Sequence, residues 1–115
     1  MHEISFAKSI LDLSLETLGD RKKKILKLNI VAGVFSGIDE SCLTFAFGMV
    51  STETYAEGAI IEIKREPVRM ICRKCGNSRE FYKPDDFDRI CENCGGDNKI
   101  EGGNGVYLDS MEIDE

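Results

Sequence analysis

The stretch Cys72-Arg-Lys-Cys75, separated by fifteen residues from Cys91-Glu-Asn-Cys94, determines how this chain is interpreted. Two Cys-x2-Cys pairs at this separation are typical of a zinc site. Two intervening residues let one tight turn direct both sulfurs toward the same point, and four thiolates satisfy the tetrahedral preference of Zn²⁺. No coordination position then remains for catalysis. We therefore predict a structural zinc site formed by Cys72, Cys75, Cys91 and Cys94.

The residues around the two pairs agree with this prediction. Gly76 and Gly95 each follow the second cysteine of a pair, where a positive φ lets the chain fold back with its N–H groups toward sulfur. Zinc with four thiolates carries a net charge of −2, which nearby basic residues can offset: Arg69, Arg73, Lys74 and Arg79. A pair of disulfides and a thiol redox centre are the alternatives. Both are less favoured because nothing indicates an oxidising compartment.

Length and charge limit the remaining possibilities. The chain has 115 residues, enough for one domain with a small module, and 42% of its residues are hydrophobic. Its 21 acidic and 15 basic residues give a net charge of −6, which argues against binding along a nucleic-acid backbone. The opening residues lack the apolar segment of a signal peptide, and no apolar run has the length of a membrane span. We expect a cytoplasmic protein.

Hydrophobic periodicity predicts an α+β fold. Residues 1–18 have helical spacing and end at Gly19, and residues 25–34 alternate as a strand does. Asp39 is placed to cap a second helix. Strands are expected at 59–64 and at 106–113, the last one returning to the first sheet. The predicted order is helix, strand, helix, strand, zinc module, strand, with two helices on a three-stranded sheet and a four-cysteine zinc ribbon inserted.

The same patterns predict which side chains are buried. One face of the first strand carries Leu26, Leu28, Ile30 and Ala32. The second helix is expected to bury one side, through Leu43, Phe45, Ala46, Phe47, Met49 and Val50. Cys42 stands among these apolar residues, and we expect it to be a small core residue rather than a metal ligand. Phe81 and Tyr82 are expected to cover a small core beside the metal.

The single histidine of the chain is His2. The amine of Met1 and the imidazole of His2 flank one peptide nitrogen, so a metal that displaces that amide proton gains three nitrogens in two fused chelate rings. Nickel(II) and copper(II) favour such square-planar nitrogen sites. The amine and imidazole must lose protons to bind, so binding is expected to weaken below about pH 6. Taken alone, a histidine at position two is more often an exposed residue without a role.

These features together resemble the HypA/HybF family, the nickel metallochaperones of [NiFe]-hydrogenase maturation. The resemblance rests on Met1-His2-Glu3, a first helix, Phe45-Ala46-Phe47 in the second helix, the two Cys-x2-Cys pairs and a closing strand. It implies a nickel-binding domain of residues 1–66 plus 104–115 and a zinc-binding domain of residues 67–103. It also implies nickel held by Met1 and His2 with Glu3 assisting, and zinc held by the four cysteines.

The resemblance further implies a carrier rather than an enzyme. Nickel would pass to a hydrogenase large-subunit precursor, together with a GTPase of the HypB type, from a monomer or a homodimer. Asp39 matches an acidic position that is a possible nickel neighbour in the family, although its helix-cap role explains it equally well. No Gly-rich phosphate loop is present, and a single histidine leaves no catalytic dyad except one that uses His2 itself.

Two features depart from the family pattern. Some members carry a histidine directly after a cysteine pair, where this chain has Gly76 and Gly95. A pH switch built on such histidines is therefore not expected here. Other members complete the nickel plane with a histidine from the zinc domain, and this chain has none. The fourth nickel ligand is then a backbone amide such as that of Glu3, a carboxylate, water or a partner residue, which favours a labile site.

Two other function classes remain as alternatives. The first is a zinc-ribbon module that binds protein or nucleic acid. The excess of positive charge between Arg65 and Lys83, with six Lys or Arg and two Glu, allows it. The net negative charge of the whole chain disfavours nucleic-acid binding. A thiol redox protein is the second alternative, and tightly held zinc with four unreactive thiols would exclude it.

Overall fold

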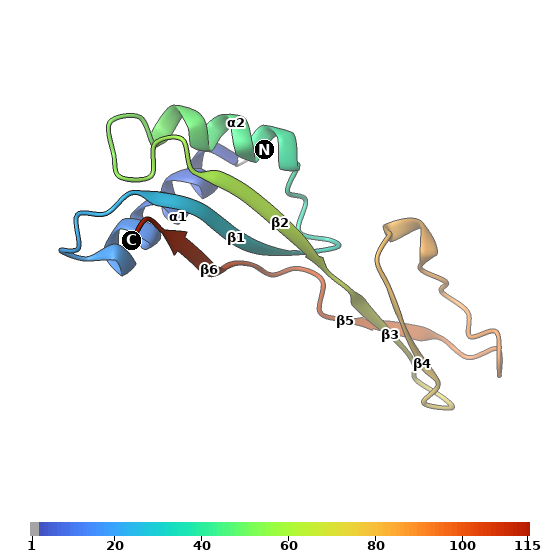
Figure 1. The fold of residues 1–115 in the computed structure, drawn as a ribbon. Coiled ribbons are helices and arrows are strands. Elements are labelled where there is room, and N and C mark those ends of the chain that lie inside the picture. Colours follow the sequence, from blue (N-terminus) through green and yellow to red (C-terminus); the bar gives the residue numbers. More distant parts are fainter. Residues whose placement is uncertain (1–2) are drawn as a thin grey trace. The chain divides into compact units, whose positions relative to one another are not determined.

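The computed structural model describes residues 3–115, and these residues divide into two compact units. The first unit is drawn from Met1–Ile30, Ile38–Lys64 and Tyr107–Glu115. The second unit contains Val31–Gly37 and Arg65–Val106. Each unit has its own three-stranded sheet (Figure 1). Met1 and His2, the two predicted nickel ligands that precede Glu3, lie outside the described residues.

Two helices and a sheet form the first unit, as the α+β prediction required. Helix α1 runs from Glu3 to Leu18 and helix α2 from Glu40 to Val50, and the two pack against each other. Strand β1 (Ile25–Gly33) lies between β2 (Ile60–Glu66) and β6 (Val106–Ile113) (Figure 1). The closing strand therefore returns to the first sheet, as predicted.

Buried side chains of the first unit follow the helical and strand periods. The buried residues of α1 recur at spacings of three and four: Glu3, Ala7, Ile10, Leu11, Ser14 and Leu18. Leu28 and Ile30 of β1 are buried on the predicted face, and so is Ala32, which belongs to the second unit. Leu26 was predicted on that face but is 42% exposed. Ile25 is fully buried instead. Its backbone N–H donates to the carbonyl of Tyr55, which lies in the turns after α2.

Lys27 connects all three strands of the first sheet. Its ammonium lies 2.8 Å from the Glu62 carboxylate on β2 and 3.8 Å from that of Glu112 on β6. Because β1 is the central strand, one side chain reaches both neighbours. The pKa of Lys27 is raised by the hydrogen bond and the negative charge of Glu62, and by the charge of Glu112.

The second unit is built on a small antiparallel sheet. Its strand order is β4-β3-β5, with β3 at Val68–Cys72, β4 at Ser78–Phe81 and β5 at Asn98–Glu101, and a 3-10 turn, η1, covers Pro84–Asp86. Pro67 separates β2 from β3, since proline has no N–H for the ladder. Sequence analysis predicted no strand inside the zinc module.

Apolar residues of the second unit gather beside β3. Val68, Met70 and Phe81 are buried, with Val34 and Phe87 packed against them. Phe35 meets Phe81 edge-on, with ring centroids 6.0 Å apart. Phe81 is thus part of this core as expected, whereas Tyr82 is 60% exposed and does not cover it. Tyr82 follows β4 directly, and successive residues of an extended chain point to opposite faces.

Candidate metal centres

The first candidate centre is made by two turns of similar construction. Cys72 ends β3, and the N–H of Gly76 donates to its carbonyl at 3.1 Å. In the second turn the N–H of Gly95 donates to the carbonyl of Cys91 at 2.8 Å. Gly76 and Gly95 have φ of +77° and +79°, a conformation that a side chain disfavours. Each glycine thus closes a knuckle that holds two sulfurs on one side.

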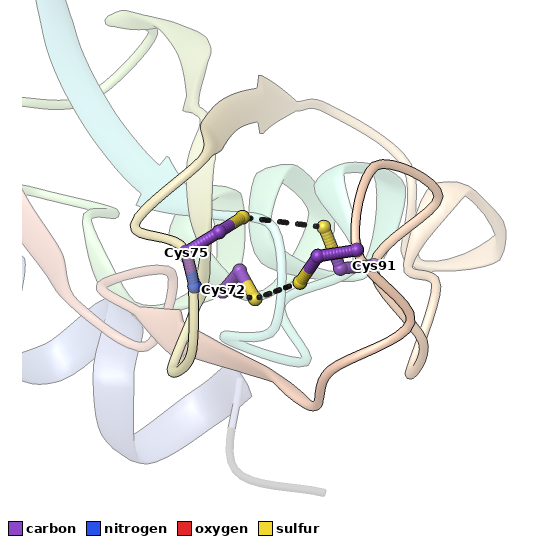
Figure 2. A group of neighbouring side chains, drawn as sticks. Cys72, Cys75 and Cys91 are labelled. Atoms are coloured by element: carbon purple, nitrogen blue, oxygen red, sulfur yellow. Dashed lines mark hydrogen bonds between the residues drawn. The ribbon is translucent and has the colours of Figure 1, made fainter.

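The two knuckles bring all four sulfurs together. Figure 2 shows the Cys72, Cys75 and Cys91 side chains directed toward a common centre. Cys72 Sγ lies 3.4 Å from Cys94 Sγ, and Cys75 Sγ lies 3.8 Å from Cys91 Sγ. All four sulfurs lie within 4.8 Å of one another. Sulfurs bound to one zinc ion at about 2.3 Å are about 3.8 Å apart, so the arrangement fits tetrahedral Zn²⁺ without rearrangement of the backbone.

Backbone amides supply positive partial charge to the sulfurs. Cys72 Sγ accepts the N–H groups of Lys74 and Cys75 at 3.3 and 3.4 Å. Cys94 Sγ accepts the N–H of Gly96 at 3.4 Å, and the Asn93 amide lies 3.8 Å from Cys75 Sγ. Sequence analysis expected N–H groups to point toward sulfur but did not identify which residues supply them. Backbone donors carry no sequence signal beyond the Cys-x2-Cys spacing itself, and an asparagine is unremarkable in a turn.

The same contacts give the cysteine thiols different pKa values. The N–H groups of Cys75 and Lys74 lower the pKa of Cys72 to about 6, against the effect of burial. The pKa of Cys75 is also lowered, chiefly by the N–H of Asn77. At Cys94 the N–H of Gly96 favours the thiolate, but the neighbouring Cys72 sulfur and burial outweigh it and raise the pKa to about 11. Before metal binds, Cys72 is therefore the thiolate and Cys94 the thiol of this pair.

The second candidate centre lies at the start of α1. Glu3 occupies the first turn of α1, where the helix dipole favours a negative charge. Its side chain is 5% exposed, and Oε2 accepts a long hydrogen bond of 3.5 Å from the N–H of Asp39. Oε1 is buried and has no hydrogen-bond partner among residues 3–115. An unsatisfied buried carboxylate oxygen is costly, so this position suits a cation or a donor beside it.

Asp39 connects the two helices at this point. It is the N-cap of α2, and its Oδ1 accepts the N–H of Cys42 at 2.9 Å. Its own N–H faces Glu3 Oε2, so the starts of α1 and α2 meet through these two acidic residues. The predicted helix-cap role of Asp39 is confirmed. A role beside nickel stays a prediction.

The prediction that Cys42 is a core residue is wrong. Cys42 is exposed at the first turn of α2. The pKa of its thiol is raised, first by the negative charge of Asp39, then by partial burial and by a hydrogen bond to the Asp39 side chain, and finally by the charge of Glu3. Cys42 therefore lies in the negative field of both carboxylates.

Helical spacing explains why Cys42 was misplaced. The buried stripe of α2 is Leu43, Ala46 and Phe47. Cys42, Phe45 and Met49 form a second stripe on the neighbouring side, and Phe45 and Met49 are 71% and 50% exposed rather than buried as predicted. Counting both stripes at spacings of three and four would have separated them.

The exposed stripe of α2 borders an open hollow of the first unit. Ile4 of α1 is 54% exposed at its edge, and the hollow has a volume of about 450 Å³. Its walls are mainly apolar and come from both helices: Glu3, Ile4, Ser5, Ser41, Cys42, Phe45, Ala46 and Met49. Glu3 and Cys42 thus share one surface concavity next to the start of the chain.

Of the predicted site residues, the structure brings the four cysteines together and places Glu3 beside Asp39. Among residues 3–115, the four cysteines are the only group of three or more metal-binding side chains whose ligand atoms converge. No helix in that range is both long and apolar enough to cross a membrane. Met1 and His2 carry the remaining predicted nickel ligands and lie outside the described residues.

Comparison with known proteins shows which family has this arrangement. Residues 1–113 match the model of the family described as "Hydrogenase/urease nickel incorporation, metallochaperone, hypA". Hydrogenase maturation factor HypA of Syntrophus aciditrophicus is 35% identical, with 99% of this chain and 98% of that protein covered. The Dehalococcoides mccartyi factor is 31% identical over 100% of this chain and 96% of that one.

Solved structures agree with the sequence matches. The nickel metallochaperone HypA from Helicobacter pylori is 28% identical with a TM-score of 0.64, covering 98% of this chain and 97% of that one. A second HypA structure is 30% identical with a TM-score of 0.67, covering 98% and 96%. The chain therefore belongs to the HypA family of nickel metallochaperones for hydrogenase maturation.

Proposed function

We propose that this protein carries Ni(II) at its amino terminus and delivers it to a [NiFe]-hydrogenase large-subunit precursor, with zinc as a structural ion. Family membership supports the nickel chemistry. The observation that carries the site is Glu3, whose buried Oε1 lacks a partner among residues 3–115 although Met1 and His2 immediately precede it. A cation held by those two residues would neutralise this carboxylate.

Three nitrogens of the first two residues form the proposed nickel chelate. They are the Met1 amine, the His2 amide and the His2 imidazole. Glu3 contributes a backbone nitrogen or orients the chelate through its carboxylate, and Asp39 adds negative charge next to Glu3. Such a site favours Ni(II) over Zn(II), because zinc prefers a tetrahedron. The fourth position stays exchangeable, which a carrier needs.

In the proposed function Cys72, Cys75, Cys91 and Cys94 hold zinc. Four sulfurs within 4.8 Å of one another, with no further ligand in the group among residues 3–115, support a closed site. Zinc would stabilise the second unit, whose own apolar core is small. The ion takes no part in nickel exchange. A reducing compartment keeps such thiols available for metal, so a cytoplasmic location is part of the proposal.

Transfer would proceed by ligand exchange. A partner ligand would enter the fourth position, and return of protons to the amine, the His2 amide nitrogen and the imidazole would then release nickel from the terminal chelate. A GTPase of the HypB type and the large-subunit precursor are the proposed partners. The family description also names urease, so urease is a second proposed recipient of nickel.

Calorimetric titration of nickel into zinc-loaded protein tests this proposal. The comparison uses the native terminus, His2→Ala, and a variant with two residues added before Met1. Both changes should abolish tight binding, since each removes one end of the fused chelate. Ser5→Ala is the matched control, an exposed position in the first turns of the same helix, and it should bind as the native protein does. If the extended protein binds equally well, the terminal chelate is wrong.

A further inference from the structure

We propose that Cys75 is a peroxide-sensitive site, and that its oxidation converts the zinc centre into two disulfides that join one knuckle to the other. The first knuckle is the turn from Cys72 to Gly76, and the second is the turn from Cys91 to Gly95. The inference goes beyond nickel carriage and rests on the zinc part of the proposed function. It concerns a reversible modification of the protein, not an enzymatic redox activity.

Exposure selects the thiol that a peroxide reaches first. Cys75 is exposed, Cys94 is half-buried, and Cys72 and Cys91 are buried. Cysteines that respond to oxidants are solvent-accessible thiolates with a second cysteine beside them. A zinc ligand is already a thiolate, because the metal displaces the thiol proton. The first reaction therefore takes place at Cys75 Sγ.

Contacts between sulfurs supply the partner of each oxidised thiol. Cys75 Sγ lies 3.8 Å from Cys91 Sγ, and Cys72 Sγ lies 3.4 Å from Cys94 Sγ (Figure 2). Both contacts join the first knuckle to the second. The sulfurs of a disulfide are about 2.0 Å apart, so each pair closes by a movement of less than about 2 Å. These contacts favour the pairs Cys75–Cys91 and Cys72–Cys94.

The reaction consumes two molecules of peroxide for each zinc ion. A lone pair of the Cys75 thiolate attacks one peroxide oxygen, the O–O bond breaks, and the leaving hydroxide takes a proton from solvent to become water. Cys75 is thereby oxidised to a sulfenic acid and the peroxide is reduced. The Cys91 thiolate then attacks the Cys75 sulfur, the S–O bond breaks, and a second hydroxide leaves as water. A second peroxide joins Cys72 and Cys94 in the same way, so zinc loses its last two ligands and is released.

Disulfides between the knuckles keep the second unit connected after zinc leaves. They link positions that are 22 and 16 residues apart, so each closes a loop that contains the segment between the knuckles. Disulfides within the knuckles would leave the two turns unconnected. A crosslink across such a loop restricts the unfolded chain. The oxidised unit should therefore stay folded and take up zinc again after reduction.

Cys42 offers an internal comparison within the same chain. It is exposed as Cys75 is, but it is not part of the group of four converging cysteines. Without a metal, a thiol is only partly ionised at neutral pH, whereas the zinc-bound sulfurs are thiolates. We expect peroxide to consume Cys75 at least about tenfold faster than Cys42.

Titration of the zinc-loaded protein with hydrogen peroxide at neutral pH tests the inference. Pyridylazoresorcinol reports released zinc, and mass spectrometry assigns the disulfides after free thiols have been blocked. Trypsin and a Glu-specific protease together place each zinc cysteine on its own peptide: residues 70–73, 75–79, 90–92 and 93–99. Two equivalents of peroxide should release one zinc per chain and join 75–79 to 90–92 and 70–73 to 93–99. Cys42→Ser is the matched control and should give the same result.

Trapping and reduction complete the test. Dimedone, which captures sulfenic acids, should label Cys75 before any other cysteine, and dithiothreitol with added zinc should restore one bound zinc per chain. Disulfides within a knuckle, first labelling at another cysteine, or irreversible loss of zinc binding would each overturn the inference. Zinc that stays bound to four reduced thiols would also overturn it, and the proposed structural role of zinc would stand. A protein that takes up no zinc at all contradicts the proposed function itself.

Discussion

At the scale of single residues, the zinc centre depends on unequal thiols. Cys72 receives two amide N–H groups and has its pKa lowered to about 6, whereas the pKa of Cys94, 3.4 Å away, is raised to about 11. The lower pKa of Cys72 favours its thiolate form beside the Cys94 thiol before metal enters. Zinc must then displace the proton that Cys94 retains.

This inequality predicts how zinc affinity changes with pH. At neutral pH binding releases the Cys94 proton, so affinity should rise with increasing pH. Below pH of about 6 Cys72 is protonated as well, and a further proton must be displaced. We expect the fall in log affinity with decreasing pH to become steeper by about one unit per pH unit there. Chelator competition from pH 5 to 8 measures this slope, and a slope that stays constant through pH 6 would contradict it.

At the scale of secondary structure, the start of α2 combines two tasks. Asp39 caps the helix through the N–H of Cys42, and it also brings a carboxylate beside Glu3 at the start of α1. The cap requires only a side-chain oxygen, whereas an electrostatic role toward nickel requires the charge. One position can therefore serve both the fold and the proposed site.

Substitution of Asp39 separates these tasks. Asp39→Ala should lower the free energy of unfolding by about 1 kcal/mol, because the N-cap is lost. Asp39→Asn should leave stability within a few tenths of a kcal/mol, since asparagine caps about as well. We expect both variants to bind nickel about tenfold more weakly. Urea unfolding of zinc-loaded protein and nickel calorimetry measure the two effects. If Asp39→Asn matches the native protein in both, Asp39 is a cap alone.

At the scale of the whole molecule, the second unit is assembled from distant segments. The N–H of Phe35 donates to the carbonyl of Gly103 at 2.7 Å, and the N–H of Gly33 donates to that of Gly105 at 2.7 Å. A Cβ on Gly103 would lie 2.5 Å from Val68 Cγ2, and Gly103 has φ of +88°. Two stretches of backbone cross here without room for a side chain.

The close approach at Gly103 predicts that alanine substitutions at Gly103 and Gly105 differ in their effect on stability. Gly103→Ala should lower the free energy of unfolding by about 1–3 kcal/mol, because the methyl group meets Val68 and the backbone is strained. Gly105→Ala is the matched control, with nothing within 4 Å of the added carbon and no positive φ. Thermal unfolding of both zinc-loaded variants measures the contrast. Equal stability of the two alanine variants would show that the crossing relaxes without cost.

The sequence by itself determined the parts of this protein that depend on local spacing. Cys-x2-Cys pairs form knuckles because the turn is complete within a few residues, and Asp39 caps α2 because a cap needs only the next three residues. The helices and the strands of the first sheet follow from local hydrophobic periodicity, whereas the family resemblance rests on short motifs such as Met1-His2-Glu3 and the two Cys-x2-Cys pairs. The prediction of Met1 and His2 as nickel ligands came from their adjacency together with the family resemblance, and it stays a prediction.

Tertiary structure decided what depends on distant partners. Cys42, Phe45 and Met49 have an apolar pattern that fits a core, yet no other element among residues 3–115 covers that stripe, and they are exposed. The short strands β3, β4 and β5 form because β3 pairs with both of the others. Four or five residues are too few for their own sequence pattern to predict a strand. Burial of Glu3 beside Asp39 joins residues 36 positions apart. Local periodicity shows which side chains share a face, but only packing decides which faces are covered.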